Sequence, residues 1–355
     1  MTELQKPVSP RNSNSYDFVR FIAASMVLYS HHFALNGRPE PIVPFYGEKF
    51  GALAVYIFFS LSGFLIYLSL EKNGDWWRFA AARFLRVMPN LTVALVLSSL
   101  VTLVYFSNYA NLTAHIYYVV RGIFLALFGA GYDIPGIFET LKYQALNGPL
   151  WSLRYELHLY FFLFLIVTFG GRYRGWVLAI ALPLLIYHWM MNKNQYILGI
   201  DLFEYSRLGQ IFLSGALLGY LWKYWKNYAV PVGFAGLVLC FVLELVVPFN
   251  SFMNALTLGA AVIGLGSSSA LAWFSKGGDS SYGMYIYAWP VQQFSILYIA
   301  SFWGSMLVAF IATVMIGYTT WHSFEKRCMQ QVPRFSEFLR RGFNGLTGVF
   351  RRKLA

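Results

Sequence analysis

The sequence predicts an all-α fold, a polytopic bundle of about ten transmembrane helices. Apolar runs of about 20 residues, each long enough to cross a bilayer, recur along the chain. Hydrophobic residues make up 58% of the chain and charged residues 12%, whereas a soluble domain carries about 25% charged residues, so most of the surface is expected to face lipid. The first sixteen residues are polar, and no cleavable signal precedes the first span.

The predicted spans are separated by short polar segments. Their approximate bounds are 17–35, 50–70, 86–106, 151–169, 175–191, 205–222, 230–247, 253–274, 282–300 and 303–323. A shorter apolar piece at about 115–129 contains Arg121 and is followed by a glycine-rich loop. We predict that it forms a peripheral or re-entrant helix within a long outer loop, at about 107–150.

The distribution of Lys and Arg predicts the orientation of the bundle. With ten spans, the two termini and the segments after the second, fourth, sixth and eighth spans share one side, and they carry most of the 27 Lys and Arg residues. Cytoplasmic segments carry such an excess, so both termini are predicted to be cytoplasmic. A further crossing at 115–129 would move the strongly basic C-terminal tail outside, which fits this rule less well.

Two parts of the chain are distinguished, a membrane domain at 1–330 and a tail at 331–355. The tail is basic and has apolar residues at roughly helical spacing, which is typical of an amphipathic helix on the cytoplasmic membrane surface. The net charge of +12 does not indicate nucleic-acid binding, because the cations gather on one side of the membrane. Cys240 and Cys328 indicate neither a disulfide framework nor a metal site.

The first span carries two ionisable groups on one face. Arg20 and His31 are eleven positions apart, which is three full turns plus about 20°, and roughly 16 Å along the helix axis. Because ionisable groups inside a membrane helix are costly and usually functional, the pair indicates an anion contact at one depth and a proton acceptor at another. The alternative is an anchoring arginine, neutralised by Asp17, and a histidine bonded to a neighbouring helix. His32 lies about 100° away from this face.

Polar residues also open the fourth span. Pro149 suits the first turn of a helix, and Glu156 then enters the membrane close to Arg154. An intramembrane carboxylate needs a partner, and His31 or Arg207 at the same depth are candidates. One interpretation is that Glu156 orients a histidine base, and the other is a structural Glu156–Arg154 pair that locks helices together.

Three other segments have two interpretations each. Arg78, Arg83 and Arg86 lie at the predicted inner surface, where they either anchor the bundle or recognise phosphate. The stretch 279–290 combines tyrosines near helical spacing with a proline, which indicates aromatic packing or a broken helix that lines a substrate path. Glu325 follows the last span beside two basic residues, which predicts a surface ion pair.

These motifs, in this order, resemble the acyltransferase-3 family of membrane-bound O-acyltransferases, which decorate bacterial surface glycans. The resemblance rests on the basic residue and histidine of the first span (20–31) and on FFSLSGFLI (58–66), ARFLRVMP (82–89), LWSLRYE (150–156), SYGMYIYAWP (281–290) and FEK (324–326). Together they cover essentially the whole chain. Ala288 stands where many members carry histidine, so the resemblance implies no second catalytic histidine there, and Arg327 stands where proline often closes the last motif.

The resemblance implies an acyl-CoA donor, most often acetyl-CoA, and no permanently bound cofactor. It also implies that the acceptor is a hydroxyl of a cell-surface or secreted glycan, or of a lipid-linked oligosaccharide, and that the enzyme lies in the bacterial inner membrane. Arg20, Arg83 and Arg86 would hold the coenzyme A phosphates on the cytoplasmic side. His31 would act as general base, or be briefly acylated, with Glu156 orienting it.

Candidate contacts for the acceptor are Trp151, Arg154, Arg207 and Tyr282. We expect membrane lipids as surroundings, no metal and no nucleic-acid partner. Two alternatives remain open at this point. One is transfer of a succinyl or another short acyl group, and the other is a polytopic transporter or flippase, although the sequence shows no internal repeat.

Overall fold

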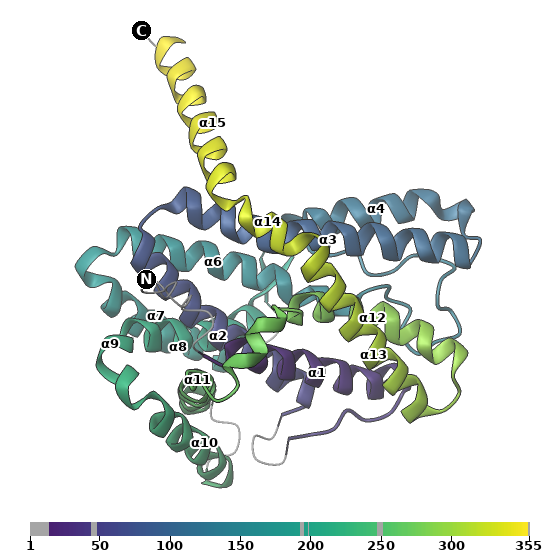
Figure 1. The fold of residues 1–355 in the computed structure, drawn as a ribbon, viewed down its shortest axis with the longest axis horizontal. Helices are drawn as coiled ribbons and strands as arrows, with labels where there is room; N and C mark the ends of the chain where they lie inside the picture. The colour runs from purple at the N-terminus through teal and green to yellow at the C-terminus, as the bar shows by residue number, and fades with distance from the viewer. Residues whose placement is uncertain (1–13, 44–47, 192–194, 198, 247–250, 354–355) are drawn as a thin grey trace, which may run out of the picture.

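The computed structural model describes residues 14–43, 48–191, 195–197, 199–246 and 251–353, and this part of the chain is an all-α bundle (Figure 1). Within it the long helices are α1 (Tyr16–Leu35), α2 (Phe50–Asn73), α3 (Trp76–Tyr105), α6 (Trp151–Phe169), α7 (Arg174–Met191), α8 (Leu202–Tyr220), α10 (Ala229–Val246), α11 (Ser251–Gly266), α12 (Ser281–Tyr298) and α13 (Phe302–Thr320). Each coincides with a predicted span to within a few residues, except at one end of α3 and one end of α11.

Shorter elements connect or extend these helices. They are α4 (Leu112–Ile123), α5 (Leu125–Phe128), α9 (Trp222–Trp225), α14 (Lys326–Gln330) and α15 (Val332–Lys353), a β-hairpin of β1 (Tyr196–Ile197) and β2 (Ile200–Asp201), the 3-10 turns η2 (Tyr109–Asn111), η3 (Gly148–Leu150), η4 (Gly171–Tyr173), η5 (Lys226–Tyr228) and η6 (Ala272–Gly277), and a π-helical turn η7 (Trp321–Glu325). The first 13 and last 2 residues, which belong to the predicted cytoplasmic termini, and residue 247 of a predicted span lie outside the described residues.

Length and apolarity mark six segments of the described chain as able to cross a membrane. They are Tyr16–Leu35, Phe50–Lys72, Trp76–Tyr105, Gly148–Phe169, Trp222–Leu243 and Phe302–Gln330. Helices α8 and α12 carry more polar residues, and most of their side chains are buried inside the bundle. Lipid-facing helices must be apolar outside, whereas central helices can carry polar groups that neighbouring helices bond.

Helix α3 begins ten residues earlier than predicted. Asp75 caps it by accepting hydrogen bonds from the backbone amides of Trp77 and Arg78, at 3.1 and 3.3 Å. The helix then continues through Pro89 to Tyr105. Its arginines therefore lie on a regular helix, which fixes the directions of their side chains.

Helix α11 ends eight residues earlier than predicted. The backbone carbonyl of its last residue, Gly266, accepts from the backbone amide of Ser15 at 2.8 Å, and Ser15 Oγ donates to the carbonyl of Ser268 at 2.7 Å. The segment that precedes α1 thus satisfies carbonyls that a longer helix would have bonded internally. The remaining apolar residues form the turn η6.

The ambiguous piece at 115–129 forms α4 and α5, and it runs back along α3. His115 Nδ1 lies 3.1 Å from Ser99 Oγ, and Gly122 packs so closely on Leu95 that a Cβ there would lie 2.6 Å from its methyl groups. Leu95 is ten residues from the end of α3, about 15 Å along the axis. The other side of the piece exposes Leu112, Ile116, Val120, Leu127 and Phe128. This geometry favours the re-entrant form of the prediction over the peripheral one.

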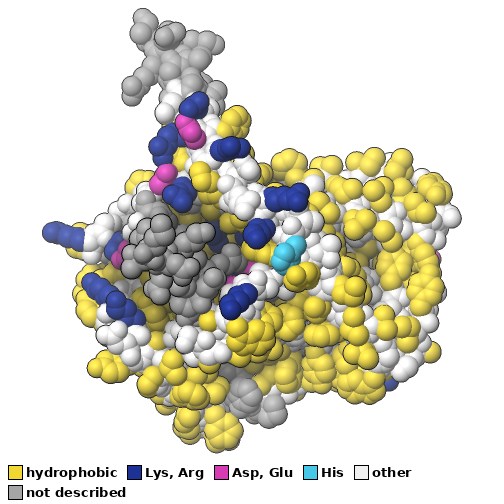
Figure 2. Space-filling model, in the orientation of Figure 1, with side chains coloured by type: hydrophobic (Ala, Val, Ile, Leu, Met, Phe, Trp, Pro, Cys, Tyr) yellow, Lys and Arg dark blue, Asp and Glu magenta, His cyan; other side chains and the backbone are white. Residues whose placement is uncertain are grey.

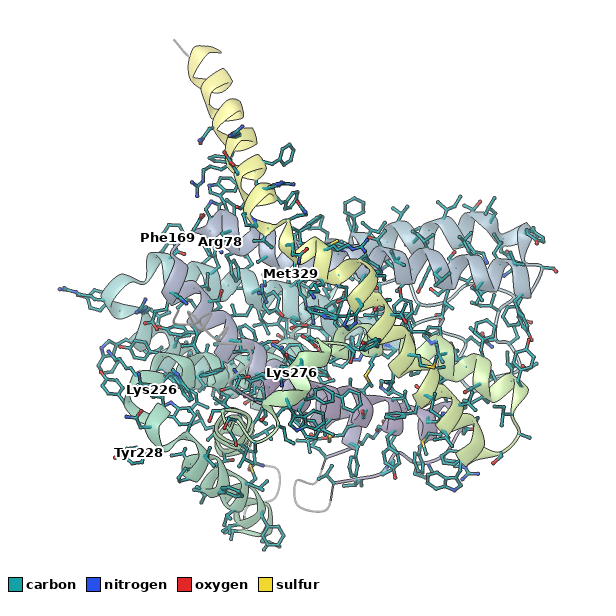
Figure 3. The ribbon with its side chains drawn as sticks, in the orientation of Figure 1. Arg78, Phe169, Lys226, Tyr228, Lys276 and Met329 are labelled. Atoms are coloured by element: carbon teal, nitrogen blue, oxygen red, sulfur yellow. The ribbon has the colours of Figure 1, made fainter. Side chains whose placement is uncertain are left out.

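Three of the segments predicted to share one side lie toward one end of the molecule. Arg78, Phe169 and Lys226 are labelled at the left of Figure 3, whereas Lys276, from the segment after the eighth span, is labelled nearer the centre. Figure 2 shows Lys and Arg gathered where α15 leaves the bundle and apolar side chains over the part formed by α4, α12 and α13.

Helix α15 covers most of the predicted tail. It crosses the first turns of α3, where Phe335 stacks on Phe84 with ring centroids 5.4 Å apart and Arg340 pairs with Asp75 at 2.7 Å. Beyond these contacts it projects from the bundle, across the direction of α3 (Figure 1).

The centre of the bundle is the contact between α2 and α8. A Cβ at Gly63 would lie 1.9 Å from the carbonyl oxygen of Phe212, and a Cβ at Gly215 would lie 2.0 Å from that of Ser60. Such small residues let two helix backbones approach closely within a membrane. This contact fixes α2, which carries one wall of each cavity described below.

We predict that Gly215→Ala destabilises the fold by about 1–3 kcal/mol, the usual cost of overpacking. Thermal unfolding of the detergent-purified protein measures the effect. Gly277→Ala is the matched control, because no atom lies within 4 Å of a Cβ at that position. Equal melting temperatures for the two variants would contradict the close approach of α2 and α8.

Candidate active site

Three cavities follow one another along α1. The inner cavity, beside the start of α1, has a volume of about 340 Å³, the central cavity about 110 Å³ and the outer cavity, beside the end of α1, about 450 Å³. Arg20 and Arg83 line both the inner and the central cavity, and Val55 and Tyr285 line both the central and the outer one. The smallest cavity therefore lies between the two larger ones and shares wall residues with each; it is called the passage below.

The inner cavity is built around a buried network of ion pairs. Arg20 pairs with Asp17 at 3.2 Å and with Asp279 at 3.3 Å. Arg86 pairs with Asp279 at 2.6 Å and with Glu325 at 3.0 Å. Asp279 is only 2% exposed and holds both arginines. The ion pair with Asp17, which belongs to the anchoring alternative for Arg20, is present, and Arg20 has a second partner in the loop before α12.

The prediction of a surface ion pair at Glu325 was wrong. Glu325 is 3% exposed and accepts from Asn90 at 2.7 Å and from Thr320 at 3.1 Å, besides its pair with Arg86. It closes the π-helical turn η7, and such a turn changes the helix face on which the next residues fall. Sequence spacing at the α-helical period could not show this inward direction.

Arg83 differs from its two neighbours. Among the described residues no carboxylate lies within ion-pair distance of it, and its Nε is buried without a hydrogen-bond partner. Its guanidinium lies 5.9 Å from the ring centroid of Tyr160 and lines both the inner and the central cavity. Arg83 is thus a cation that faces a cavity and has no ion-pair partner among the described residues, with the carboxylate of Glu156 in the same central cavity.

Glu156 lies in the central cavity, away from its predicted partners. Its carboxylate accepts from Ser62 at 2.9 Å and from Tyr160, and it has no hydrogen bond to His31, which lines the outer cavity. Arg154 donates instead to the backbone carbonyls of Leu127 and Gly199, at 2.9 and 2.8 Å. Neither the Glu156–His31 contact nor the alternative Glu156–Arg154 pair is found.

Tyr285 forms the boundary between the central and outer cavities. Its hydroxyl lies 2.7 Å from Ser152 Oγ and donates to the carbonyl of Pro149, and its ring contacts Phe58 at a centroid distance of 6.1 Å. These contacts fix the tyrosine in the wall that the two cavities share, which also includes Val55.

His31 lines the outer cavity. Its ring meets Trp289 edge-on at a centroid distance of 5.2 Å, and its Nδ1 is buried without a hydrogen-bond partner. His32 instead bonds the carbonyl of Phe302 at 3.1 Å and Ser305 Oγ at 3.0 Å, and it is fully buried. The two histidines therefore lie in different surroundings, one in a cavity wall and one bonded to α13.

Two carboxylates in the outer cavity were not predicted. Glu40 accepts from Ser30 at 2.6 Å and from Lys49 at 2.9 Å, and Glu48 accepts from Tyr56 at 3.0 Å. Partial burial opposes ionisation of Glu40, but the hydrogen bonds from Ser30 and Lys49 hold its pKa below the ordinary value. The hydrogen bond to Glu40 raises the pKa of Lys49. Both groups are therefore charged at neutral pH.

The four residues predicted for the acceptor divide between the cavities. Trp151 and Arg207 line the outer cavity, with Arg207 paired to Glu204 at 2.6 Å. Tyr282 lines the central cavity, where its hydroxyl donates to the carbonyl of Val87 at 2.9 Å. Arg154 lines none of the three cavities. Within the described residues, no group of three or more His, Cys, Asp and Glu could hold a metal ion.

Comparison with known proteins agrees with this architecture. Residues 13–322 match the acyltransferase-3 family, described as an acyltransferase domain, and the chain belongs to this family. It is an acyltransferase and a multi-pass membrane protein.

Two relatives are similar over most of their length. An O-acetyl transferase of Shigella phage Sf6 is 30% identical over 91% of this chain and 98% of its own length. Nodulation protein 10 of Rhizobium leguminosarum bv. viciae is 24% identical over 91% of this chain and 95% of its own length. No solved structure matches the chain.

We predict that Asp279→Asn destabilises the protein by about 1.5–3 kcal/mol, because it removes the buried carboxylate that Arg20 and Arg86 share and leaves each arginine with one carboxylate partner. Thermal unfolding in detergent measures this loss. Glu337→Gln breaks the exposed pair with Arg341 and serves as the control, since exposed pairs contribute roughly 0–1 kcal/mol. A loss no larger than that of the control would show that the network does not hold the helices together.

Proposed function

We propose that this protein transfers an acetyl group from acetyl-CoA to a hydroxyl of a cell-surface or secreted bacterial glycan, such as an O-antigen or exopolysaccharide. The observation that carries the proposal is the series of three neighbouring cavities, with shared wall residues, that lie between the arginine network and His31. The phage relative named O-acetyl transferase supports acetyl, rather than succinyl, as the transferred group.

The inner cavity suits the coenzyme A phosphates. Arg83 has no carboxylate partner among the described residues, and a bound polyanion would complete its interactions with charge-assisted hydrogen bonds. Arg20 and Arg86 already donate to carboxylates, so only their remaining N–H groups would be available to the phosphates. Their ion pairs would fix the position of the cavity wall. Arg83 is accordingly our principal phosphate contact.

The central cavity suits the pantetheine arm. At about 110 Å³ it is the smallest of the three cavities, and its wall includes the apolar side chains of Val55, Phe58 and Leu153. Arg20 and His31 are roughly 16 Å apart along α1, a length that an extended arm can span. Ser62 and Glu156 line this passage, and we assign to them contacts with the polar groups of the arm instead of the earlier role of Glu156 at His31.

The reaction takes place where the passage opens at His31. The imidazole accepts the proton of the glycan hydroxyl while the hydroxyl oxygen attacks the thioester carbonyl carbon. The tetrahedral intermediate then collapses, the carbon–sulfur bond breaks, and the leaving thiolate takes the proton from His31. A positioned base contributes about 10²–10⁴ in rate, and alignment in the narrow passage contributes further.

The outer cavity suits the acceptor. It is wide, with a volume of about 450 Å³, and it combines charged groups with the indole of Trp151, which offers an apolar face to a sugar ring. Arg207 lies in the same wall, with its guanidinium 5.6 Å from the ring centroid of Tyr56. Donor and acceptor would thus reach His31 from opposite ends.

This arrangement requires one orientation in the membrane. The inner cavity must open to the cytoplasm, where acyl-CoA is made, which agrees with both termini being cytoplasmic. The basic helix α15 would then lie along the anionic cytoplasmic surface of the bacterial inner membrane.

We predict that purified protein with labelled acetyl-CoA and an acceptor polysaccharide releases free thiol and labels the glycan. His31→Ala should lower this rate by about 10²–10⁴-fold. His322→Ala removes an exposed histidine in the turn η7, which follows α13, and this variant should transfer at the wild-type rate. Mass spectrometry of surface polysaccharide should show one acetyl unit per modified residue.

Other outcomes of this assay separate the alternatives. Faster transfer from succinyl-CoA would identify a succinyl transferase. Glycan transport without thiol release would favour a flippase and contradict the proposal. A stable acyl group on His31 would make this residue an acyl carrier.

We predict that Arg83→Ala raises the KM for acetyl-CoA by about 10–100-fold, as expected from the loss of a hydrogen bond to a charged group worth roughly 1.5–3 kcal/mol. The KM for the acceptor should change little, because the acceptor enters the outer cavity. Arg78→Ala on the same helix is the control, since this arginine is exposed and lines neither the inner nor the central cavity (Figure 3). Equal donor KM values for the two variants would place the phosphates elsewhere.

A further inference from the structure

The loop between α1 and α2 brings a carboxylate to the end of α1. Glu40 Oε2 accepts from Ser30, the residue before His31, at 2.6 Å. Its other oxygen accepts from Lys49, the residue before α2, at 2.9 Å. The carboxylate therefore has a fixed position between the ends of two helices, in the wall of the cavity that His31 lines.

The local backbone is shaped around this carboxylate. The amide of Val43 donates to the carbonyl of Glu48 at 2.7 Å, and the amide of Phe50 donates to that of Pro41 at 3.1 Å, so the two ends of the loop are paired. At Gly51 a Cβ would lie 3.1 Å from Ser30 Oγ and 3.6 Å from Glu40 Oε2. Any larger residue at position 51 would press against the Ser30–Glu40 hydrogen bond.

His31 shares the outer cavity with several charged or titratable groups. Among them, Glu40 is held through Ser30, the residue next to His31 in the chain, and its negative charge favours the protonated imidazole. Lys49 opposes this influence, because its charge has the same sign as a protonated imidazole. Glu48 and Arg207 lie in the same cavity, but they are bonded to Tyr56 and Glu204 respectively. The tyrosines 56 and 285 complete the titratable groups of this cavity.

We propose that Glu40 is a positioning residue that stabilises the protonated form of His31 during transfer. This inference rests on the proposed function, in which His31 accepts a proton from the hydroxyl and returns it to the thiolate. A fixed negative charge beside the imidazole strengthens it as a base and stabilises the cation that forms. The role assigned from sequence to Glu156 belongs in this proposal to Glu40.

The test is the pH dependence of kcat/KM for acetyl transfer by the purified protein. Only the neutral imidazole accepts a proton, so the acidic limb of the profile reports protonation of His31 in the free enzyme. A nearby opposite charge moves the midpoint of such a limb by roughly 1–3 pH units. Glu40→Gln should therefore move the acidic limb to lower pH by about one unit or more and lower kcat.

Three further variants separate this role from a structural one. Glu40→Asp keeps the charge and should restore most of the limb's position. Glu48→Gln removes the other carboxylate of the cavity and should leave the acidic limb where it is, whatever it does to the KM. Gly51→Ala keeps Glu40 but displaces it from Ser30, and should move the limb in the same direction as Glu40→Gln.

The outcomes distinguish this inference from the proposed function. Absence of thiol release by the wild-type protein contradicts the proposed function itself. Transfer by the wild type together with an unchanged acidic limb in Glu40→Gln overturns the inference about Glu40 alone. A third outcome would assign Glu40 a role in stability and would also overturn the inference. In that outcome Glu40→Gln and Glu40→Asp both lose activity and have a lowered melting temperature, and Gly51→Ala leaves the acidic limb unmoved.

Discussion

A charged side chain within a bilayer is costly unless it faces the interior of the bundle and has a partner there. This constraint organises the molecule. Arg20 and Arg86 turn inward and share Asp279, and Glu325 turns inward through a π-helical turn to meet Arg86. Because these carboxylates come from segments far apart in the sequence, the network joins α1, α3, α12 and α13 at one end.

The same network accounts for the special position of Arg83. Its two neighbouring arginines are already paired, whereas its own guanidinium faces the cavity and its Nε lacks a hydrogen-bond partner. Three arginines close together would repel one another in a low-dielectric setting, and three carboxylates reduce that repulsion. The network thus makes it possible to keep one cation available for an anionic ligand.

The rigid geometry of α1 relates the two ends of the passage. A helix fixes both the distance and the relative direction of side chains eleven positions apart. Between Arg20 and His31 the central and outer cavities share Val55 and Tyr285, and Ser152 and Pro149 hold the tyrosine. In the proposed reaction these two side chains would lie between the nucleotide and the glycan.

Sequence analysis predicted what depends on local periodicity. Runs of about 20 apolar residues located the helices, and helical phase separated His31 from His32. It did not predict contacts between distant segments. Glu156 is bonded to Ser62 and Tyr160 rather than to His31.

The missed features share a physical cause. Glu40 lies in a loop without periodicity, and its contact with Ser30 depends on the absence of a side chain at Gly51. The cap at Asp75 and the π-helical turn at Glu325 shift helix boundaries and faces that a span-length criterion assumes to be regular. In each case tertiary contacts, which no single segment encodes, decided the position of the side chain.

The most direct test of this account is an experimental structure of the protein with a non-transferable thioether analogue of acetyl-CoA. The account predicts the nucleotide phosphates beside Arg83 in the inner cavity, the arm through the central cavity, and the acetyl end at His31. A nucleotide bound in the outer cavity, or an arm that does not reach His31, would contradict it.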